Sequence, residues 1–376
     1  MRINTTLFGN INLLTHCPLV GASESFAFVT AINESFNGVE NRVPLRDKAK
    51  QQMKFNYINF SKDFAEDFAD IRRRWAVPFN QELQYIGDAS GDIILCDTSL
   101  SDFRNDSLAL IKSGDQIRVA EIQEVLEDGL QLYYPIDEIE NATISPLRLG
   151  YFDGDIQRVY RLSHVQNTVT FVVDDPAQYI EKEPEQYKGK DIYFFVFREA
   201  NANFQSAIRK QQDFIDYEIG NFSTRSRWTH SITERAWKVV IDNKEELFEF
   251  KRFLARRLGQ FREFWMNSQE QNLIVKNTGL ITSNLDVELL NSNWTGRRKF
   301  AIHKKDGTWV AVSATGASVV GGNTRFALES PLNIYAQDIE RISYLGLYRL
   351  ATDEAEITYN GNNTATCPLT ILEYET

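Results

Sequence analysis

The feature that most constrains this chain is an internal repeat. Segments of the first half recur in the second half, in the same order and at nearly constant spacing. KQQMKFNYI (50–58) and RAWKVVID (235–242) both alternate apolar with polar residues, about 184 positions apart. Such alternation predicts a strand with one buried face in each half.

An amphipathic helix is predicted after each of these strands. Apolar residues recur every three or four positions, which is the helical period. They are Phe60, Phe64, Phe68 and Ile71 in the first half, and Leu247, Phe250, Leu254 and Leu258 in the second. Ser61 can cap the first helix. Asp242, with Glu245 completing a capping box, can cap the second, and Gly259 can end it as a left-handed residue.

A basic and aromatic segment follows each predicted helix, IRRRWAVPFN (71–80) and LARRLGQFREFW (254–265). Trp75 matches Phe261, and Phe79 matches Trp265, both at a spacing of 186. Two interpretations stay open: these side chains pack between helix and sheet, or they anchor a contact between subunits. The candidate interface residues are Arg72, Arg73, Arg74, Trp75, Arg256, Arg257, Phe261 and Trp265.

The repeat continues downstream. LALIKSGDQIRVAEI (108–122) resembles KFAIHKKDGTWVAVS (299–313), and each predicts two strands joined by a glycine-containing turn. Leu149-Gly150 matches Leu345-Gly346 at a spacing of 196, and Gly38 with Gly220 is a further match upstream. The spacing thus grows from about 182 to 196 in small steps, as loop insertions in tandem copies produce.

The repeat sets the expected domains. DDPAQYIEKEPEQYKGKD (174–191) has two prolines, several charges and no apolar period, which is typical of a linker. We therefore expect a first unit over residues 1–178, a linker over 179–191 and a second unit over 192–376. The fold class is α+β and β-rich: two tandem, similar β-sandwich or barrel units, each with one packed amphipathic helix.

Composition narrows the function classes. The net charge of −11 argues against a protein that wraps nucleic acid through a basic face. Three widely spaced cysteines predict neither a disulfide framework nor a zinc site, and favour a reducing compartment. No apolar run is long enough for a membrane span, and the first residues do not resemble a signal peptide.

The sequence offers no catalytic motif. It contains no GxGxxG, P-loop, GxSxG or HExxH pattern, and its four histidines stand apart from one another. Asp153 and Asp155 flank a glycine in YFDGDIQ, which we interpret as a turn because a calcium loop needs more ligands. We expect no catalytic, cofactor-binding or metal-binding residues, and no enzyme.

The duplicated segments resemble a known family. ESFNGVENRVPLRDKAKQQMKF and RSRWTHSITERAWKVVIDNKEELFEFKRFLARRLGQFREFW are similar to bacteriophage tail-tip structural proteins, the distal tail and baseplate hub proteins of long-tailed phages. The resemblance covers roughly residues 22–85 and 222–275. The first copy departs from the pattern because no glycine follows its helix. The motif contains no catalytic residue.

The resemblance implies a ring or hub that closes or extends the tail tube, in the virion, after synthesis in the host cytoplasm. Two similar units per chain could fill six positions as a trimer with pseudo-sixfold symmetry. The alternative is a hexamer with one half facing the tube. The implied partners are the chain itself, the tail tube protein and other tail-tip proteins. DNA could pass through an acidic ring without specific binding.

Two other classes stay open from the residues alone. Exposed aromatics and scattered acidic residues fit a virion carbohydrate-binding protein or glycan hydrolase. A cellular binding protein with two β-rich domains is the third possibility.

Overall fold

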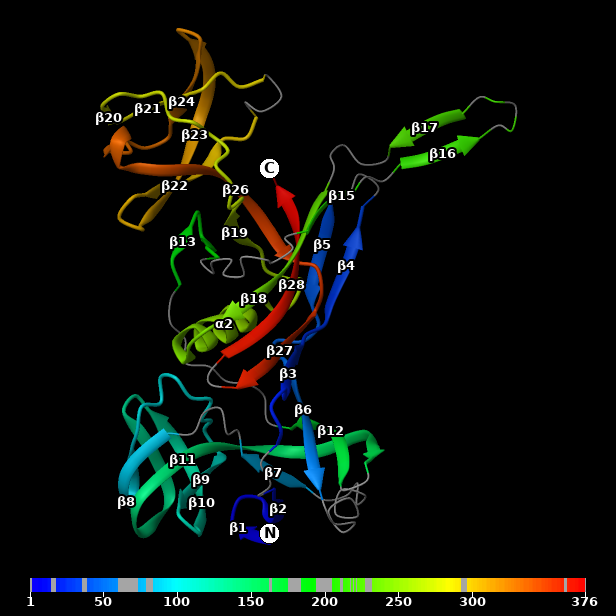
Figure 1. The fold of residues 1–376 in the computed structure, drawn as a ribbon, viewed down its shortest axis with the longest axis vertical. Helices are drawn as coiled ribbons and strands as arrows, with labels where there is room; N and C mark the ends of the chain where they lie inside the picture. Colours follow the sequence, from blue (N-terminus) through cyan, green and yellow to red (C-terminus); the bar gives the residue numbers. More distant parts are fainter. Residues whose placement is uncertain are drawn as a thin grey trace.

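The computed structural model describes residues 2–14, 18–35, 39–59, 74–78, 84–161, 164–174, 184–193, 205–209, 212–216, 218, 220, 222–226, 232–291, 296–361 and 364–375. The protein is β-rich, as predicted (Figure 1). Among these residues the helices are α2 (Lys244–Arg257) and the short 3-10 helix η3 (Ala336–Asp338). The helix predicted over 60–71 lies outside the described residues.

The described residues of the first half form twelve strands. They are β1 (Arg2–Thr5), β2 (Gly9–Leu13), β3 (Ser23–Ala27), β4 (Thr30–Glu34), β5 (Glu40–Pro44), β6 (Lys50–Asn59), β7 (Trp75–Pro78), β8 (Gln84–Leu95), β9 (Ser107–Ser113), β10 (Gln116–Leu126), β11 (Gly129–Tyr160) and β12 (Val165–Val173).

Sixteen strands lie in the described part of the second half. They are β13 (Gln186–Tyr187), β14 (Lys190–Asp191), β15 (Gln205–Arg209), β16 (Gln212–Asp216), β17 (Phe222–Ser226), β18 (Ile232–Ile241), β19 (Phe264–Asn267), β20 (Leu280–Ile281), β21 (Asn284–Val287), β22 (Lys299–Lys304), β23 (Trp309–Val320), β24 (Asn323–Leu328), β25 (Ile334–Tyr335), β26 (Ile339–Leu350), β27 (Glu354–Gly361) and β28 (Thr364–Glu375). Residues 186–191, the end of the predicted linker, form the β13–β14 hairpin.

A central antiparallel sheet runs through both halves. Its strands follow the order β15–β18–β28–β27–β3–β6–β12–β11. One hydrophobic core covers it, and α2 contributes Leu247, Phe250, Phe253 and Leu254 to that core. Trp237 is buried there, as its place in the alternating pattern predicted. The helix is therefore stabilised by packing on the sheet rather than by its own propensity.

Each half also has a smaller β cluster with its own core. In the first half it is formed by β8, β9, β10 and the start of β11. In the second it is formed by β21, β22, β23, β24 and part of β26. Figure 1 shows these clusters at opposite ends of the molecule, with the central sheet between them.

The strand registers of the two halves agree in detail. All five residue pairs of β3–β6 recur in β15–β18 when 182 is added to each number, so that Ser23↔Lys54 becomes Gln205↔Ala236. The hairpins β4–β5 and β16–β17 are also 182 positions apart. The spacing of 184 estimated from the sequence for β6 and β18 is therefore two positions too large.

The strand pair β6–β12 of the first half corresponds in the same way to β18–β28 of the second. All eight residue pairs of β6–β12 recur in β18–β28, at shifts of 182 and 200. Phe171↔Met53, for example, becomes Ile371↔Arg235.

The strands after the predicted helices also correspond. The four pairs of β7–β11 recur in β19–β26 at shifts of 189 and 198. Trp75 therefore occupies the position of Phe264, rather than of Phe261 as the sequence match indicated. Gly150 occupies that of Tyr348, two positions beyond its sequence match Gly346. The residues that correspond by strand pairing therefore lie two or three positions away from the sequence matches.

Several local predictions can be compared with the structure. Both predicted hairpins are confirmed, as β9–β10 and β22–β23. The predicted turn at YFDGDIQ is wrong, because β11 continues through it with a register shift between Asp153 and Gln157. Gly154 there has φ of 75°, which a glycine adopts without strain. The cap of α2 is Asn243, whose side chain accepts from the N–H of Glu246, rather than Asp242.

Candidate interface between the two halves

Among the described strands, β27 and β3 form the pair that joins the two halves of the chain. β27 of the second half pairs antiparallel with β3 of the first, from Glu354↔Ala27 to Thr358↔Ser23. Phe26 and Ile357 on these strands are buried. Because strands at a sheet edge expose unpaired backbone groups, this pairing satisfies both edges and makes one continuous sheet.

A buried ion pair crosses this junction. Lys251 of α2 lies 2.9 Å from a carboxylate oxygen of Glu24 on β3, and both side chains are fully buried. Glu24 also accepts hydrogen bonds from the side chains of Gln51 and Tyr359. A buried charge is tolerated only when it is paired and hydrogen-bonded, and Glu24 has three such partners.

The same polar chain extends into the first half through Arg104. Its guanidinium contacts Gln51 and lies 2.9 Å from Asp102, and Arg148 lies 2.6 Å from the same carboxylate. Burial alone would raise the pKa of Asp102, but Arg104 and Arg148 outweigh it and lower that pKa below its ordinary value. Asp102 is therefore a buried carboxylate that keeps its charge.

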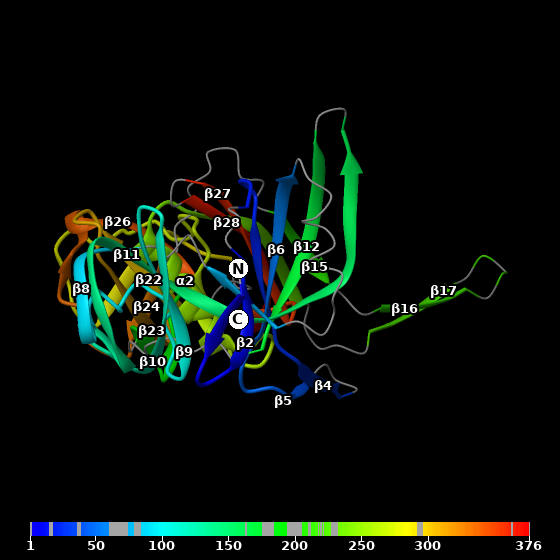
Figure 2. The same ribbon diagram turned by 90° about the horizontal axis from the view of Figure 1, so that it is seen from below.

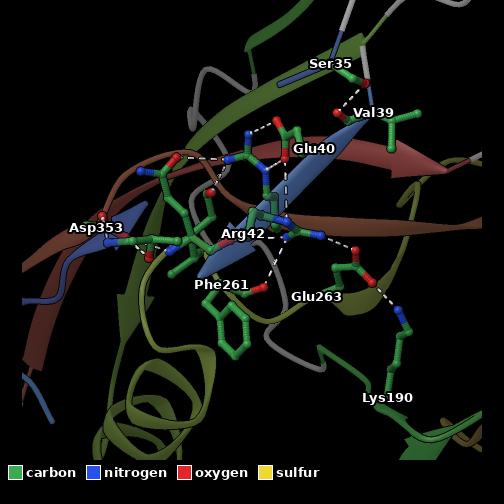
Figure 3. Close-up of polar contacts among 12 residues, drawn as sticks. Ser35, Val39, Glu40, Arg42, Lys190, Phe261, Glu263 and Asp353 are labelled. Carbon is green, nitrogen blue, oxygen red and sulfur yellow. Dashed lines mark hydrogen bonds and ion pairs between the residues drawn. The ribbon is translucent and has the colours of Figure 1, made fainter. Parts of the chain in front are cut away.

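A second polar group surrounds Arg42 of β5 (Figure 3). Arg42 donates to the carbonyl oxygens of Gln260 and Phe261, each at 3.2 Å, and forms an ion pair with Glu263. Glu263 also pairs with Lys190. Burial would raise the pKa of Glu263, but hydrogen bonds from Lys190 and Arg42 lower it below its ordinary value.

Two further contacts bind the β4–β5 hairpin to the second half. Arg349 of β26 forms a bidentate ion pair with Glu40. Its Nη2 and Nε atoms lie 2.5 and 2.9 Å from the two carboxylate oxygens. Asp353 accepts from the N–H of Thr30 at 2.7 Å and from that of Gln260 at 2.9 Å. Gly259 lies against Asp353 so closely that a Cβ would come within 2.3 Å of its carboxylate.

Of the first group of predicted interface residues, Arg74 and Trp75 lie at the start of β7. Arg72 and Arg73 are outside the described residues. Arg74 is half-buried, lies 2.7 Å from Asp174 and stacks over the ring of Phe8. Trp75 is buried in the main core.

The second group follows α2. Arg256 and Arg257 both pair with Asp191, and burial lowers the pKa of Arg257 to about 10, partly offset by Asp191. Phe261 is half-buried, and its carbonyl accepts from Arg42. Trp265 is buried and donates from its indole nitrogen to the carbonyl of Tyr187 at 2.8 Å. The contacts described for both groups are with the same chain, so their role between subunits stays a prediction.

Sequence reasoning missed the residues that join the halves. A signal was present for one of them: Lys251 falls on the apolar face of α2, between Phe250 and Leu254, where a charge needs a buried partner. Glu24 gave no such signal, because its partner Lys251 lies more than 200 positions away in the sequence. Asp102 has Arg104 two residues away, but nothing in the local pattern shows that both are buried or that Arg148 joins them.

The described residues contain no group of three or more histidine, cysteine, aspartate or glutamate side chains that could hold a metal ion. No helix in the described part of the chain is long and apolar enough to cross a membrane. No protein-family model matches the chain, and no curated protein matches it significantly. The arrangement of buried ion pairs fixes one half against the other.

Proposed function

We propose that the chain is a duplicated structural unit, and that it forms a ring or hub in the tail tip or baseplate of a bacteriophage. The observation that favours this proposal is the recurrence of all eight pairs of β6–β12 in β18–β28. Two unrelated β domains have no reason to share a register over several strands, because register is set by each domain's own core.

A chain with two similar units can form a ring from a small number of copies. Its two units can occupy neighbouring positions around an axis, so three chains supply six similar blocks. Contacts in such a ring are heterologous, with one face docking on a different face of the neighbour. The junction of β27 with β3 is already a contact of this kind between two units of one chain.

The proposed partners are further copies of the chain, the tail tube protein and other tail-tip proteins. The net charge of −11 fits a conduit for DNA, since an acidic bore does not retain phosphates. In this role the protein acts through shape and assembly and performs no catalysis.

The mass of the assembly tests this function. The purified chain is measured by native mass spectrometry and sedimentation over a wide concentration range, alone and mixed with tube protein. We expect a defined trimer, or its assembly upon mixing. A chain that stays monomeric under all conditions and binds or cleaves a polysaccharide would overturn the proposal.

A further inference from the structure

We infer that β15 of one copy pairs antiparallel with residues 156–160 of β11 in the next copy, in the register set by β3 and β27. This inference rests on the proposed ring and adds which strands make its contacts. It follows from the order of the central sheet, in which β11, β12, β6 and β3 repeat as β27, β28, β18 and β15.

The strand registers show which strands of the occupied junction correspond to the two outer edges of the sheet. β15 corresponds to β3 at a shift of 182. β27 corresponds to the end of β11 at a shift of 199, because Val159↔Gln166 and Tyr160↔Val165 recur as Thr358↔Thr366 and Tyr359↔Ala365. The chain thus already contains one junction between these strand types.

Among the residues that the structure describes, neither outer edge of the central sheet has a second strand beside it. Within the described part of the chain, β15 pairs with β18 alone, and residues 157–160 of β11 pair with β12 alone. Figure 2 shows the β16–β17 hairpin, which follows β15, reaching away from the body of the molecule. An open strand edge is a template for pairing with another chain.

Burial distinguishes the occupied junction from the open one. Phe26 is 3% exposed beside β27, whereas its equivalent Ile208 is 66% exposed. Tyr359 is 3% exposed, whereas its equivalent Tyr160 is 71% exposed. The open edges therefore present large side chains at positions that are buried where a neighbour is present, and burying them favours association.

The occupant is a second copy of this chain. β15 corresponds to β3, which pairs with β27, and the end of β11 corresponds to β27. β15 of one copy and the end of β11 in another copy can therefore pair as β3 and β27 do. The pairs of β27 with β3 translate into a defined intermolecular register. The pairs expected between two copies are Ile156↔Ile208, Gln157↔Ala207, Arg158↔Ser206 and Val159↔Gln205. Pairing in this register would continue the central sheet from one copy to the next.

Disulfide trapping tests this register. The double variant Gln157→Cys with Ala207→Cys places two thiols opposite one another across the junction, where directly paired residues have Cβ atoms about 4.5–5.5 Å apart. The control, Gln157→Cys with Gln205→Cys, displaces one thiol by two residues on the same strand face. Single-cysteine variants account for the three native cysteines. We expect mild oxidation to link chains in the first variant and not in the control.

A charge on the edge gives a second test. Ile208→Lys should weaken assembly by about tenfold or more, because it replaces a side chain that becomes buried. Val319→Lys is the matched control, since Val319 is also 66% exposed on a strand. Circular dichroism checks that both variants fold. Equal assembly of the two variants would contradict the inference.

The outcomes separate the inference from the proposed function. Rings that form while only the displaced control is linked, or neither variant is linked, overturn the strand pairing and leave the ring intact. A chain that is monomeric at every concentration overturns both. A strand from another protein on β15 would appear as a mixed disulfide and would also contradict pairing between copies.

Discussion

At the scale of single residues, buried charges are tolerated because they are paired, and the largest such group lies within the first half. Asp102, Arg104 and Arg148 are almost completely buried, and their ion pairs are 2.6 to 2.9 Å long. Such a group contributes little net stability compared with apolar side chains of the same size, but removing one member is costly because the others are left uncompensated. Alternation predicted the buried Trp237 correctly. The charged cluster was not predicted, because nothing in the local pattern shows that Asp102 and Arg104 are buried or that Arg148 joins them.

Asp102→Asn should lower the free energy of unfolding by about 3–5 kcal/mol, because two buried guanidinium groups lose their counter-charge. Asp137→Asn is the control, since it removes an exposed ion pair with Arg118 and should cost at most about 1 kcal/mol. Urea unfolding monitored by fluorescence measures both. Equal costs for the two variants would contradict the role assigned to the cluster.

The difference in unfolding free energy between the wild-type protein and Asp102→Asn should depend on pH. The folded protein lowers the pKa of Asp102, so its contribution is present above the unfolded value, about 3.9, and is lost as the pH falls below it. The difference between the wild-type protein and Asp102→Asn should be constant from pH 7 to pH 5 and shrink below about pH 4.

At the scale of elements, local patterns predicted type better than position. Both hairpins and α2 were expected, but the helix cap was placed one residue early. Asp242 and Asn243 are both good capping residues, and sequence alone does not choose between adjacent candidates. The bulge at Gly154 was mistaken for a turn, because a glycine between aspartates is typical of both.

Asn243→Ala should destabilise the protein by about 1 kcal/mol, because the N–H of Glu246 loses its acceptor. Asn243→Asp keeps an acceptor and places a negative charge at the positive end of the helix, so it should retain stability. Thermal unfolding measures both changes. Loss of stability in the aspartate variant but not in the alanine variant would show that this contact is unimportant.

At the scale of the whole molecule, the β-rich class could be predicted from the sequence, and the junction between the two halves could not. The pairs of β27 with β3 join residues more than 300 positions apart in the chain. β11 spans 32 residues and passes from the small cluster into the central sheet, a path that no periodicity predicts. The two halves also resemble each other more closely in the register of their strand pairs than in the residue types at corresponding positions.

Electron cryo-microscopy of the assembled ring is the most direct test of the central proposal. We predict three copies around the axis, six similar blocks, and density for a sheet that continues from β15 of each copy into β11 of the next. Six copies with only one half around the axis, or a dimer related by a twofold axis, would contradict it.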